Sequence, residues 1–168
     1  MTTLPLTDAE LRYVERAVEL AEEALRAGDE PFGSVLVDGE GQVVREARNL
    51  VRTAGDRTQH PEFELARWAA GRLEPEERAR CVVFTSGEHC AMCAAAHGWA
   101  GLGRIVYAHS SAELTQWLGE LGVAPSPVRP LSIQEVVPAL DVQGPVPAFT
   151  DRLRTMHRDL HTRDRSRP

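Results

Sequence analysis

The amino-acid sequence predicts a three-layer α/β fold, in which helices cover both faces of a central sheet. Two observations lead to this prediction. A β-hairpin is expected over residues 32–50, and helical and strand-like segments then alternate from residue 60 to about residue 121. A chain of 168 residues, 42% of them hydrophobic and 26% charged, is long enough to bury one such core. We therefore expect a single domain over residues 1–168, with residues 1–122 as its core.

The first helix is the most clearly marked element. Thr7 and Glu10 form a capping box, in which each side chain accepts a hydrogen bond from a backbone N–H at the helix start. Apolar residues then recur at helical spacing, and Gly28 is placed to end the helix. This helix is therefore expected to end just before Gly28.

The segments that follow are predicted from local patterns. Residues 32–37 are rich in β-forming side chains, and the turn sequence D-G-E-G separates them from a second strand over residues 42–50. The polar residues 52–59 indicate a loop. The alternating part is predicted as a helix over 60–72, a strand over 81–85, a helix over 90–100, a strand over 104–108 and a helix over 111–121 that Ser111 caps.

The C-terminal part of the chain is less regular. Six of the eleven prolines lie between Pro125 and Pro147. Because proline lacks a backbone N–H, we expect this part to be mostly connections with one short strand. A last helix over about 149–160 and a charged tail complete the predicted segment 123–168.

Charge and composition narrow the classes of partner. The net charge of −6 disfavours a broad phosphate-binding surface, because nucleic-acid binders usually present a basic face, so small molecules are favoured. No apolar run reaches the roughly 18 to 20 residues of a membrane helix, and the N-terminus lacks the pattern of a secretory signal. Three cysteines, two of them in a C-x-x-C pair, are a poor disulfide set. The cytoplasm is therefore the expected compartment.

Two short motifs indicate a metal site. His60 and Glu62 form an H-x-E motif at one predicted helix start, and Cys90 and Cys93 form a C-x-x-C motif at the next. Helix N-termini carry partial positive charge, which favours thiolates. Two thiolates and one imidazole leave the fourth tetrahedral position of Zn²⁺ open, as in a catalytic site. We therefore expect Zn²⁺ at His60, Cys90 and Cys93, with Glu62 carrying protons between water and substrate.

These motifs and their surroundings resemble a known family. H-P-E at 60–62 and E-H-C-A-M-C at 88–93 look like the H-x-E…P-C-x-x-C pattern of the cytidine deaminase-like superfamily. The sequence P-F-G-S-V-L-V at 31–37 is similar to the P-F-G-A-V-L-V strand of its guanine deaminase and tRNA adenosine deaminase branch. The D-x-T-x-H at 56–60 and the W-A at 99–100 are further similarities, so that the resemblance spans roughly residues 7–110.

The resemblance implies more than the residues alone do. It implies a mixed central sheet of about five strands, hydrolytic deamination with Zn²⁺ as cofactor, and a homodimer. It also implies that Asn49 contacts the substrate, with a role in capping the end of a strand as the alternative. Phe32 and Trp99 are candidate stacking platforms for the substrate, with an ordinary place in the core as the alternative.

Two positions depart from the family pattern. Pro61 stands where alanine is usual between the histidine and the glutamate, and proline suits a first helical turn. His89 stands where proline usually precedes the first cysteine. We expect His89 at the rim of the zinc site, facing either the substrate or solvent, and titrating near its reference pKa of about 6.5. His89 is therefore a fourth candidate for substrate binding.

The favoured substrate is a free nucleobase or nucleoside, with guanine-like purines ahead of cytosine or another amino-heterocycle, which places the protein in purine metabolism. One alternative is a tRNA adenosine deaminase, in which arginines near the C-terminus would contact the RNA. Another is a non-catalytic zinc module. The arginines are Arg152, Arg154, Arg158, Arg163, Arg165 and Arg167. An intact Glu62 argues against the zinc module, because structural zinc does not need it.

The remaining cysteine and histidines suggest no second site. Cys81 opens an apolar strand and is expected to be a small buried hydrophobic residue. His157 and His161 share one helix face and are expected at the surface.

Overall fold

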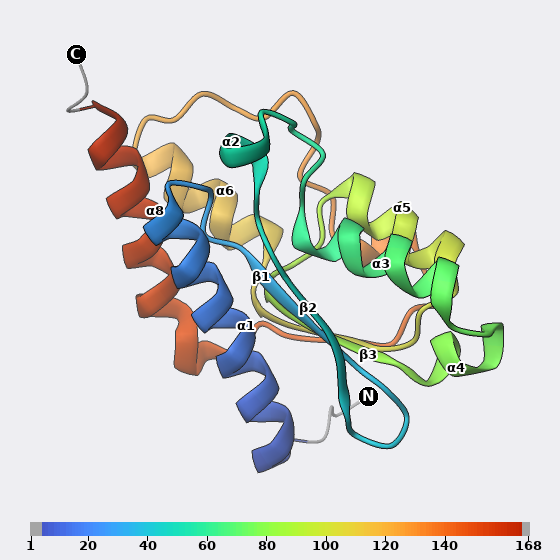
Figure 1. The fold of residues 1–168 in the computed structure, drawn as a ribbon. Coiled ribbons are helices and arrows are strands. Elements are labelled where there is room, and N and C mark those ends of the chain that lie inside the picture. Colours follow the sequence, from blue (N-terminus) through green and yellow to red (C-terminus); the bar gives the residue numbers. More distant parts are fainter. Residues whose placement is uncertain (1–4, 166–168) are drawn as a thin grey trace.

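The computed structural model describes residues 5–165, with side chains to residue 163, as a mixed sheet between two layers of helices (Figure 1). The sheet has the order β2-β1-β3-β4-β5. Strand β1 pairs antiparallel with both β2 and β3, while β3, β4 and β5 are parallel to one another. The strands are β1 (Gly33–Val37), β2 (Val43–Arg48), β3 (Val82–Gly87), β4 (Ile105–His109) and β5 (Val142–Gln143). The predicted three-layer class with a mixed five-stranded sheet is confirmed.

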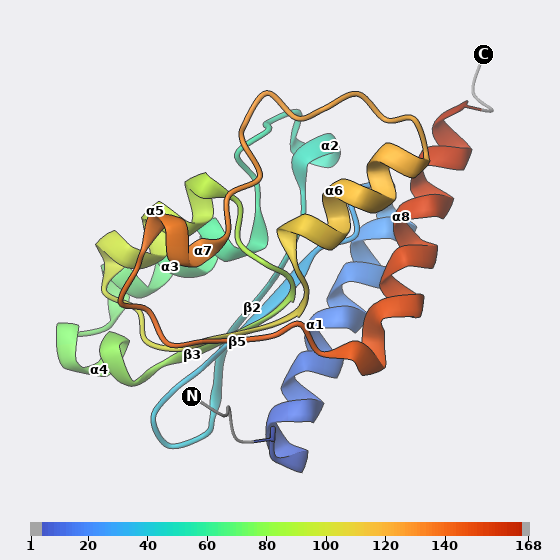
Figure 2. The ribbon, with the colours of Figure 1, turned by 180° about the vertical axis from the view of Figure 1, so that it is seen from behind.

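Helices cover both faces of this sheet. The helices are α1 (Asp8–Ala27), α2 (Val51–Ala54), α3 (Pro61–Arg72), α4 (Pro75–Arg80), α5 (Ala91–Ala100), α6 (Ser111–Glu120), α7 (Ile133–Val136) and α8 (Thr150–Arg165), with a 3₁₀ turn at Pro147–Phe149. Figures 1 and 2 show α1 and α8 packed side by side on one face and α3 and α5 on the other. The long connection after α6 crosses the top of the molecule in Figure 2.

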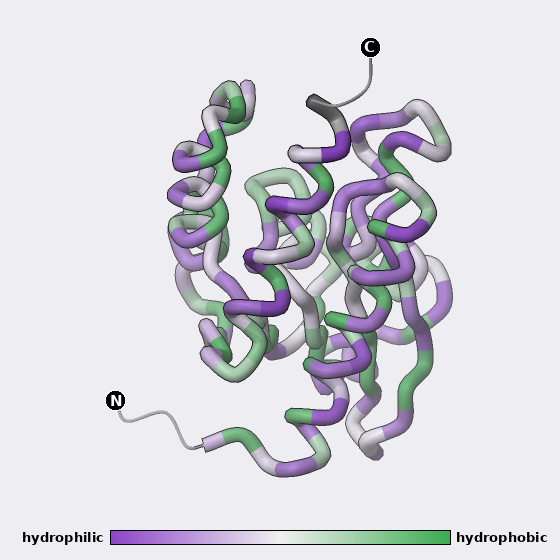
Figure 3. Tube along the Cα trace, turned by 90° about the vertical axis from the view of Figure 1, so that its left-hand side faces the viewer, coloured by the Kyte–Doolittle hydropathy of each residue, from purple (hydrophilic) through white to green (hydrophobic). Residues whose placement is uncertain are grey.

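Alternation along the strands divides the core into two parts. Val35 and Val37 face the cluster formed with α1 and α8, whereas Leu36 belongs to the cluster under α3 and α5. Every residue of β1 is buried, as expected for a strand covered by helices on both sides. The helices are correspondingly amphipathic, and Figure 3 shows hydrophobic and hydrophilic residues alternating along their traces.

Helix α1 is fixed to the sheet by close packing. The capping box between Thr7 and Glu10 is present, and Gly28 ends the helix in a left-handed conformation, so both predictions are confirmed. A Cβ at Gly33 would lie 2.4 Å from the backbone oxygen of Ala17. Only glycine therefore lets β1 pass this close to α1.

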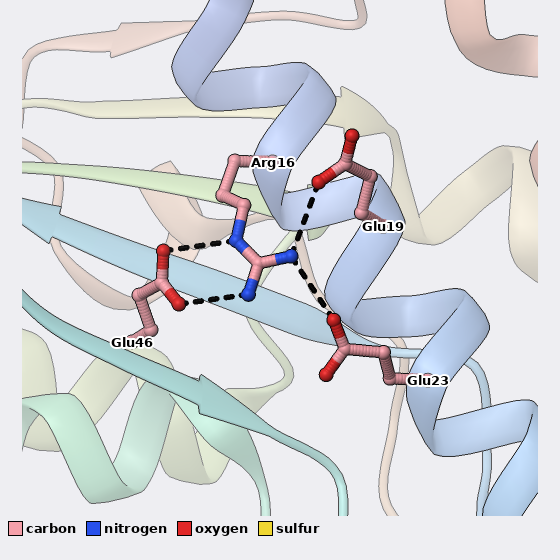
Figure 4. A network of polar contacts seen from close by, with 4 residues as sticks. All are labelled: Arg16, Glu19, Glu23 and Glu46. Atoms are coloured by element: carbon pink, nitrogen blue, oxygen red, sulfur yellow. Dashed lines mark hydrogen bonds and ion pairs between the residues drawn. The ribbon is translucent and has the colours of Figure 1, made fainter.

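A charged cluster on the outside joins α1 to β2 (Figure 4). The Arg16 guanidinium donates two hydrogen bonds to the Glu46 carboxylate, each of 2.9 Å. It also donates to Glu19 at 3.1 Å and to Glu23 at 3.0 Å. The paired Glu46 carboxylate raises the pKa of Arg16 above its usual value. A bidentate pair of this kind fixes the direction of the edge strand relative to the helix.

The structure differs from the prediction mainly in short elements. Helices α2, α4 and α7, each of four to six residues, were not predicted. Ser110 caps α6, and Ser111 is its first helical residue, so the predicted cap was wrong by one position. Helix α8 continues to Arg165, and the rest of the expected tail, with Arg167, lies outside the described residues. Within residues 5–165, no helix has the length and apolar character needed to span a bilayer.

Candidate active site

The H-x-E and C-x-x-C motifs meet at the carboxyl end of β3. His60 is the residue that precedes α3, and Cys90 is the residue that precedes α5, so both stand at helix N-termini. Cys93 lies in the first turn of α5 and is fully buried. Active sites of α/β sheets commonly form at this edge, where loops leave the carboxyl ends of the strands.

Three atoms of these residues form a nearly equilateral triangle. His60 Nδ1 lies 3.6 Å from Cys90 Sγ and 3.6 Å from Cys93 Sγ, and the two sulfur atoms are 3.6 Å apart. Zinc bonds of about 2.3 Å to sulfur and 2.0–2.1 Å to nitrogen, at tetrahedral angles, require separations of about 3.6 to 3.8 Å. The three residues therefore fit a tetrahedral zinc ion, and the set is placed to bind a metal.

The pKa of each of these three groups depends on its hydrogen bonds within the triangle. The hydrogen bond from the Cys93 thiol, together with the nearby His60, lowers the pKa of Cys90 to about 4. The bond to Cys90 raises the pKa of His60 to about 9, while the pKa of Cys93 is raised by its bond to Cys90 and by burial. A metal ion must therefore displace the Cys93 proton, so metal affinity falls as the pH falls.

Glu62 lies beside this triangle in the first turn of α3. Its side chain is buried, with Oε2 3.6 Å from Cys93 Sγ and Oε1 3.1 Å from the Thr85 hydroxyl. Burial raises the pKa of Glu62, because a carboxylate loses solvation there. A raised pKa suits a group that must accept and return a proton near neutral pH.

Glu88 holds the loop that carries the cysteines, a role that the sequence did not suggest. One carboxylate oxygen accepts from the backbone N–H of Ser111 and the other from that of Ile133, both at 2.8 Å. These N–H groups open α6 and α7, whose partial positive charge favours a carboxylate. Glu88, two residues before Cys90, thus ties the loop that carries the cysteines to the first residues of α6 and α7.

Asn49 is fully buried directly after β2, and among the described residues only the oxygen of its side-chain amide has a hydrogen-bond partner. The carbonyl oxygen accepts from the backbone N–H of Val51 at 3.0 Å, which fixes the orientation of the amide. The Nδ2 group has no hydrogen-bond partner within the described part of the chain. Asp29, also fully buried, accepts from the backbone N–H groups of Arg52 and Thr53 at 2.9 and 2.8 Å and so anchors α2 after Asn49.

Phe32 lies at the edge of a buried cluster that links β4, α6 and α8. Its ring centroid is 5.1 Å from that of His157 and 6.0 Å from that of His109. Trp117 packs against His109 at 5.2 Å. The expected surface position of His157 is therefore wrong, because α8 turns this residue into the core, where it is only 2% exposed.

We expect His109 to make the protein less stable in acid. Burial lowers the pKa of His109 to about 4, whereas an unfolded histidine has a pKa of about 6.5. The unfolded chain binds the proton more readily, so this contribution is complete above pH 6.5 and is lost as the pH falls towards 4. At pH 5 the free energy of unfolding should be about 2 kcal/mol lower than at pH 8 through His109 alone.

Urea unfolding of the protein and of His109→Gln at pH 5 and pH 8 measures this contribution. The difference in free energy between the two pH values should be smaller in the variant, which has no imidazole at this position. An equal difference in both proteins would contradict the buried, neutral state of His109.

The other two candidate substrate residues, His89 and Trp99, differ sharply in exposure. His89 is 1% exposed, and its ring packs edge-on against His97 with centroids 5.2 Å apart. His89 therefore does not face solvent, which was one of its two expected orientations, and burial lowers its pKa well below the expected value. Trp99 lies near the C-terminal end of α5 and is 92% exposed. Cys81 is buried, as predicted.

Comparisons with known proteins agree with this geometry. The family of the cytidine and deoxycytidylate deaminase zinc-binding region matches residues 7–109. A probable cytosine deaminase of Schizosaccharomyces pombe is 32% identical over 127 residues, which are 74% of this chain and 75% of that protein. A guanine deaminase of Bacillus subtilis is 38% identical over 97 residues, 57% of this chain and 62% of that protein.

The fold is also similar to that of a solved deaminase structure. The structure of a guanine deaminase from Nitrosomonas europaea superposes with a TM-score of 0.71 and 19% identity, covering 95% of this chain and 87% of that one. The motifs lie within the family match over residues 7–109, and the fold match extends over nearly the whole chain. The chain belongs to the cytidine and deoxycytidylate deaminase family and is a zinc-dependent hydrolytic deaminase.

Proposed function

We propose that the protein removes the exocyclic amine of a free nucleobase or nucleoside, with a guanine-like purine as the preferred substrate and cytosine as the second. Water supplies the oxygen, the ring carbon loses its amino group, and ammonia leaves. The observation that carries the proposal is the buried Glu62 carboxylate, which lies 3.6 Å from Cys93 Sγ and so beside the metal-binding triangle. Relatives that act on guanine and on cytosine support this class of substrate.

In this proposal His60, Cys90 and Cys93 hold the zinc ion and Glu62 moves the protons. Bound zinc lowers the pKa of a water molecule, so that hydroxide is available near neutral pH. Glu62 would carry both protons of this water in turn, the first to the ring nitrogen and the second to the departing amine, which then leaves as ammonia. Its burial keeps bulk water from competing for the proton.

Ammonia release from a panel of purines, pyrimidines, their nucleosides and amino-triazines tests the proposal. We expect release from guanine or a close analogue, and a preference for cytosine would move the assignment to the pyrimidine branch. No release from any base or nucleoside would contradict a small-molecule substrate.

The charges of α8 support a small molecule over RNA. Arg152 pairs with Glu22 at 2.7 Å, and Arg154 pairs with Glu120 at 2.5 Å. Arginines that neutralise the protein's own carboxylates offer less charge to phosphates. Activity on a free base should therefore survive a rise in salt, whereas RNA binding weakens steeply with salt.

We expect Asn49 to contact the substrate through its unpartnered Nδ2 group, which suits a ring carbonyl or ring nitrogen. Asn49→Ala should lower kcat/KM about tenfold to a hundredfold, because a substrate acceptor is left without its donor. Asn49→Ser is the matched control, since its hydroxyl can still accept from the Val51 N–H but cannot replace Nδ2. It should keep the stability of the parent and lose the same activity; unchanged kinetics in both would leave Asn49 a strand-end residue.

We propose that the protein is a homodimer that covers Trp99. An indole that is 92% exposed on a helix beside the active site is costly in water and is typical of an interface. Trp99→Asp should therefore shift the protein from dimer to monomer in light scattering after size exclusion. Val128→Asp, at a second exposed apolar residue, should leave the dimer intact. A parent protein that is already monomeric contradicts the proposal.

We also propose that residues 1–168 act as one deaminase domain in the cytoplasm. Leu153 and Leu160 of α8 share a core cluster with α1, which supports the single domain. All three cysteines are free, and a site with two thiolates suits a reducing compartment.

A further inference from the structure

Two buried hydroxyl groups lie next to each other on the sheet, close to Glu62. Ser34 of β1 stands opposite Thr85 of β3 in the antiparallel register, and both residues are fully buried. Ser34 is two residues from Leu36, and Thr85 is two residues from Val83, so both hydroxyls face the layer of α3 and α5. This is the layer that contributes Glu62.

The hydroxyls form a short chain of hydrogen bonds that ends on Glu62. Ser34 Oγ donates to Thr85 Oγ1 at 2.8 Å, and Thr85 Oγ1 lies 3.1 Å from Glu62 Oε1. A hydroxyl carries one hydrogen, so Thr85 can donate to Glu62, to the backbone oxygen of Gly87, which is also 3.1 Å away, or to that of Gly33 at 3.4 Å. A carboxylate is the stronger acceptor, because a hydrogen bond to a charged group is stronger than one to a neutral carbonyl.

This chain acts on only one of the two carboxylate oxygens. Glu62 Oε1 is held by Thr85, while Oε2 faces the metal-binding triangle at 3.6 Å from Cys93 Sγ. A carboxylate that must exchange a proton with water and then with a ring nitrogen needs one oxygen fixed in direction. Rotation of the carboxyl group about its last bond would remove that direction, and the Thr85 hydroxyl opposes the rotation.

We propose that Thr85, oriented by Ser34, is a positioning residue that holds Glu62 Oε1 so that Oε2 faces the reacting atoms. The inference rests on the proposed role of Glu62 as the proton carrier. Thr85 itself gains and loses no proton overall, it is fully buried, and it is not one of the metal-binding residues. Its effect is therefore expected on the rate of turnover and not on substrate binding.

The first test compares Thr85→Val, which keeps the shape and removes the hydroxyl, with Thr85→Ser, which keeps the hydroxyl. Thr85→Val should lower kcat about 10- to 100-fold, the cost of a misplaced catalytic group, with KM within about twofold. Thr85→Ser should recover kcat to within about threefold of the parent, and Ser34→Ala should have a smaller effect than Thr85→Val. Zinc content and the free energy of unfolding are measured for each variant, so that a loss of metal or of fold is seen directly.

The second test repeats Thr85→Val in the Glu62→Gln background. If Thr85 acts through Glu62, the second substitution should not lower the residual rate further. An equal loss in both backgrounds, a loss that Thr85→Ser does not recover, or unchanged kcat in Thr85→Val would overturn the inference. If Thr85→Val does not fold, Ser34→Ala is compared in the parent and in Glu62→Gln. A loss of kcat in the parent alone supports the inference, and no loss in the parent or an equal loss in both overturns it.

The two proposals fail in different ways. Full activity of Glu62→Gln would remove the proton-carrier role and with it this inference. An inactive Glu62→Gln together with a fully active Thr85→Val would leave the proposed function in place and remove only the role of Thr85.

Discussion

Replacing Glu62 by glutamine should lower kcat about 10²- to 10⁴-fold, the contribution that general acid–base groups usually make. The amide fills the same space in the first turn of α3 but neither accepts nor returns a proton. Glu62 is not part of the metal-binding triangle, so the variant should keep its zinc. Ammonia release on the best substrate, zinc content by atomic emission and the free energy of unfolding are measured together.

Glu64→Gln is the matched control for this variant. Glu64 lies two residues further along α3, where it pairs with Arg45 at 3.1 Å and is 40% exposed. The same chemical change there should leave kcat within about twofold, because exposed ion pairs contribute little. A loss of less than about 100-fold in Glu62→Gln would contradict the proton-carrier role.

Cys93→Ala should abolish tight zinc binding and, with it, activity. The substitution removes one of three atoms that surround the metal position at 3.6 Å from one another. Loss of a residue that only supports a ligand already costs about 10- to 100-fold in metal affinity, so loss of a ligand should cost more. Cys93 is fully buried, so the variant should also unfold at lower temperature. Cys90→Ala should behave in the same way.

Cys81→Ala is the control for cysteine chemistry in general. Cys81 is as buried as Cys93 but donates its thiol hydrogen to the backbone oxygen of Glu77, outside the triangle. This variant should keep one zinc ion per chain and most of the activity, at a modest cost in stability from the lost side-chain volume. Full zinc content in Cys93→Ala and Cys90→Ala would refute the ligand assignment.

Local patterns were sufficient for the long elements of the fold. The capping box at Thr7 and Glu10 marks the start of α1, and the helix over Pro61–Arg72 begins and ends where the sequence indicated. The short helices α2, α4 and α7 were missed, because four to six residues are too few to show the helical spacing of apolar side chains. The start of α7 also depends on Glu88, whose carboxylate accepts from Ile133, 45 residues away.

His157 and His89 are both more buried than expected, for different reasons. His157 lies four residues from Leu153 and three from Leu160, so it falls in the apolar stripe of α8, and this spacing was a usable signal. His89 gave no such signal. Its burial depends on His97, which α5 brings beside it with ring centroids 5.2 Å apart.

Residue types and their spacing indicate the chemistry of this protein: a histidine, two cysteines and a glutamate, at a spacing that suits a zinc-dependent deaminase. Residue type and helix starts suffice for that, because metal preference and thiolate stabilisation are local properties. Which polar side chains surround those groups depends instead on how separate elements pack. Ser34 meets Thr85 because β1 and β3 pair in one register, and Thr85 meets Glu62 because α3 packs on that face of the sheet. Residues 23 and 51 positions apart in the chain thus share one hydrogen-bond network, and no local pattern encodes a contact that only the packing of separate elements creates.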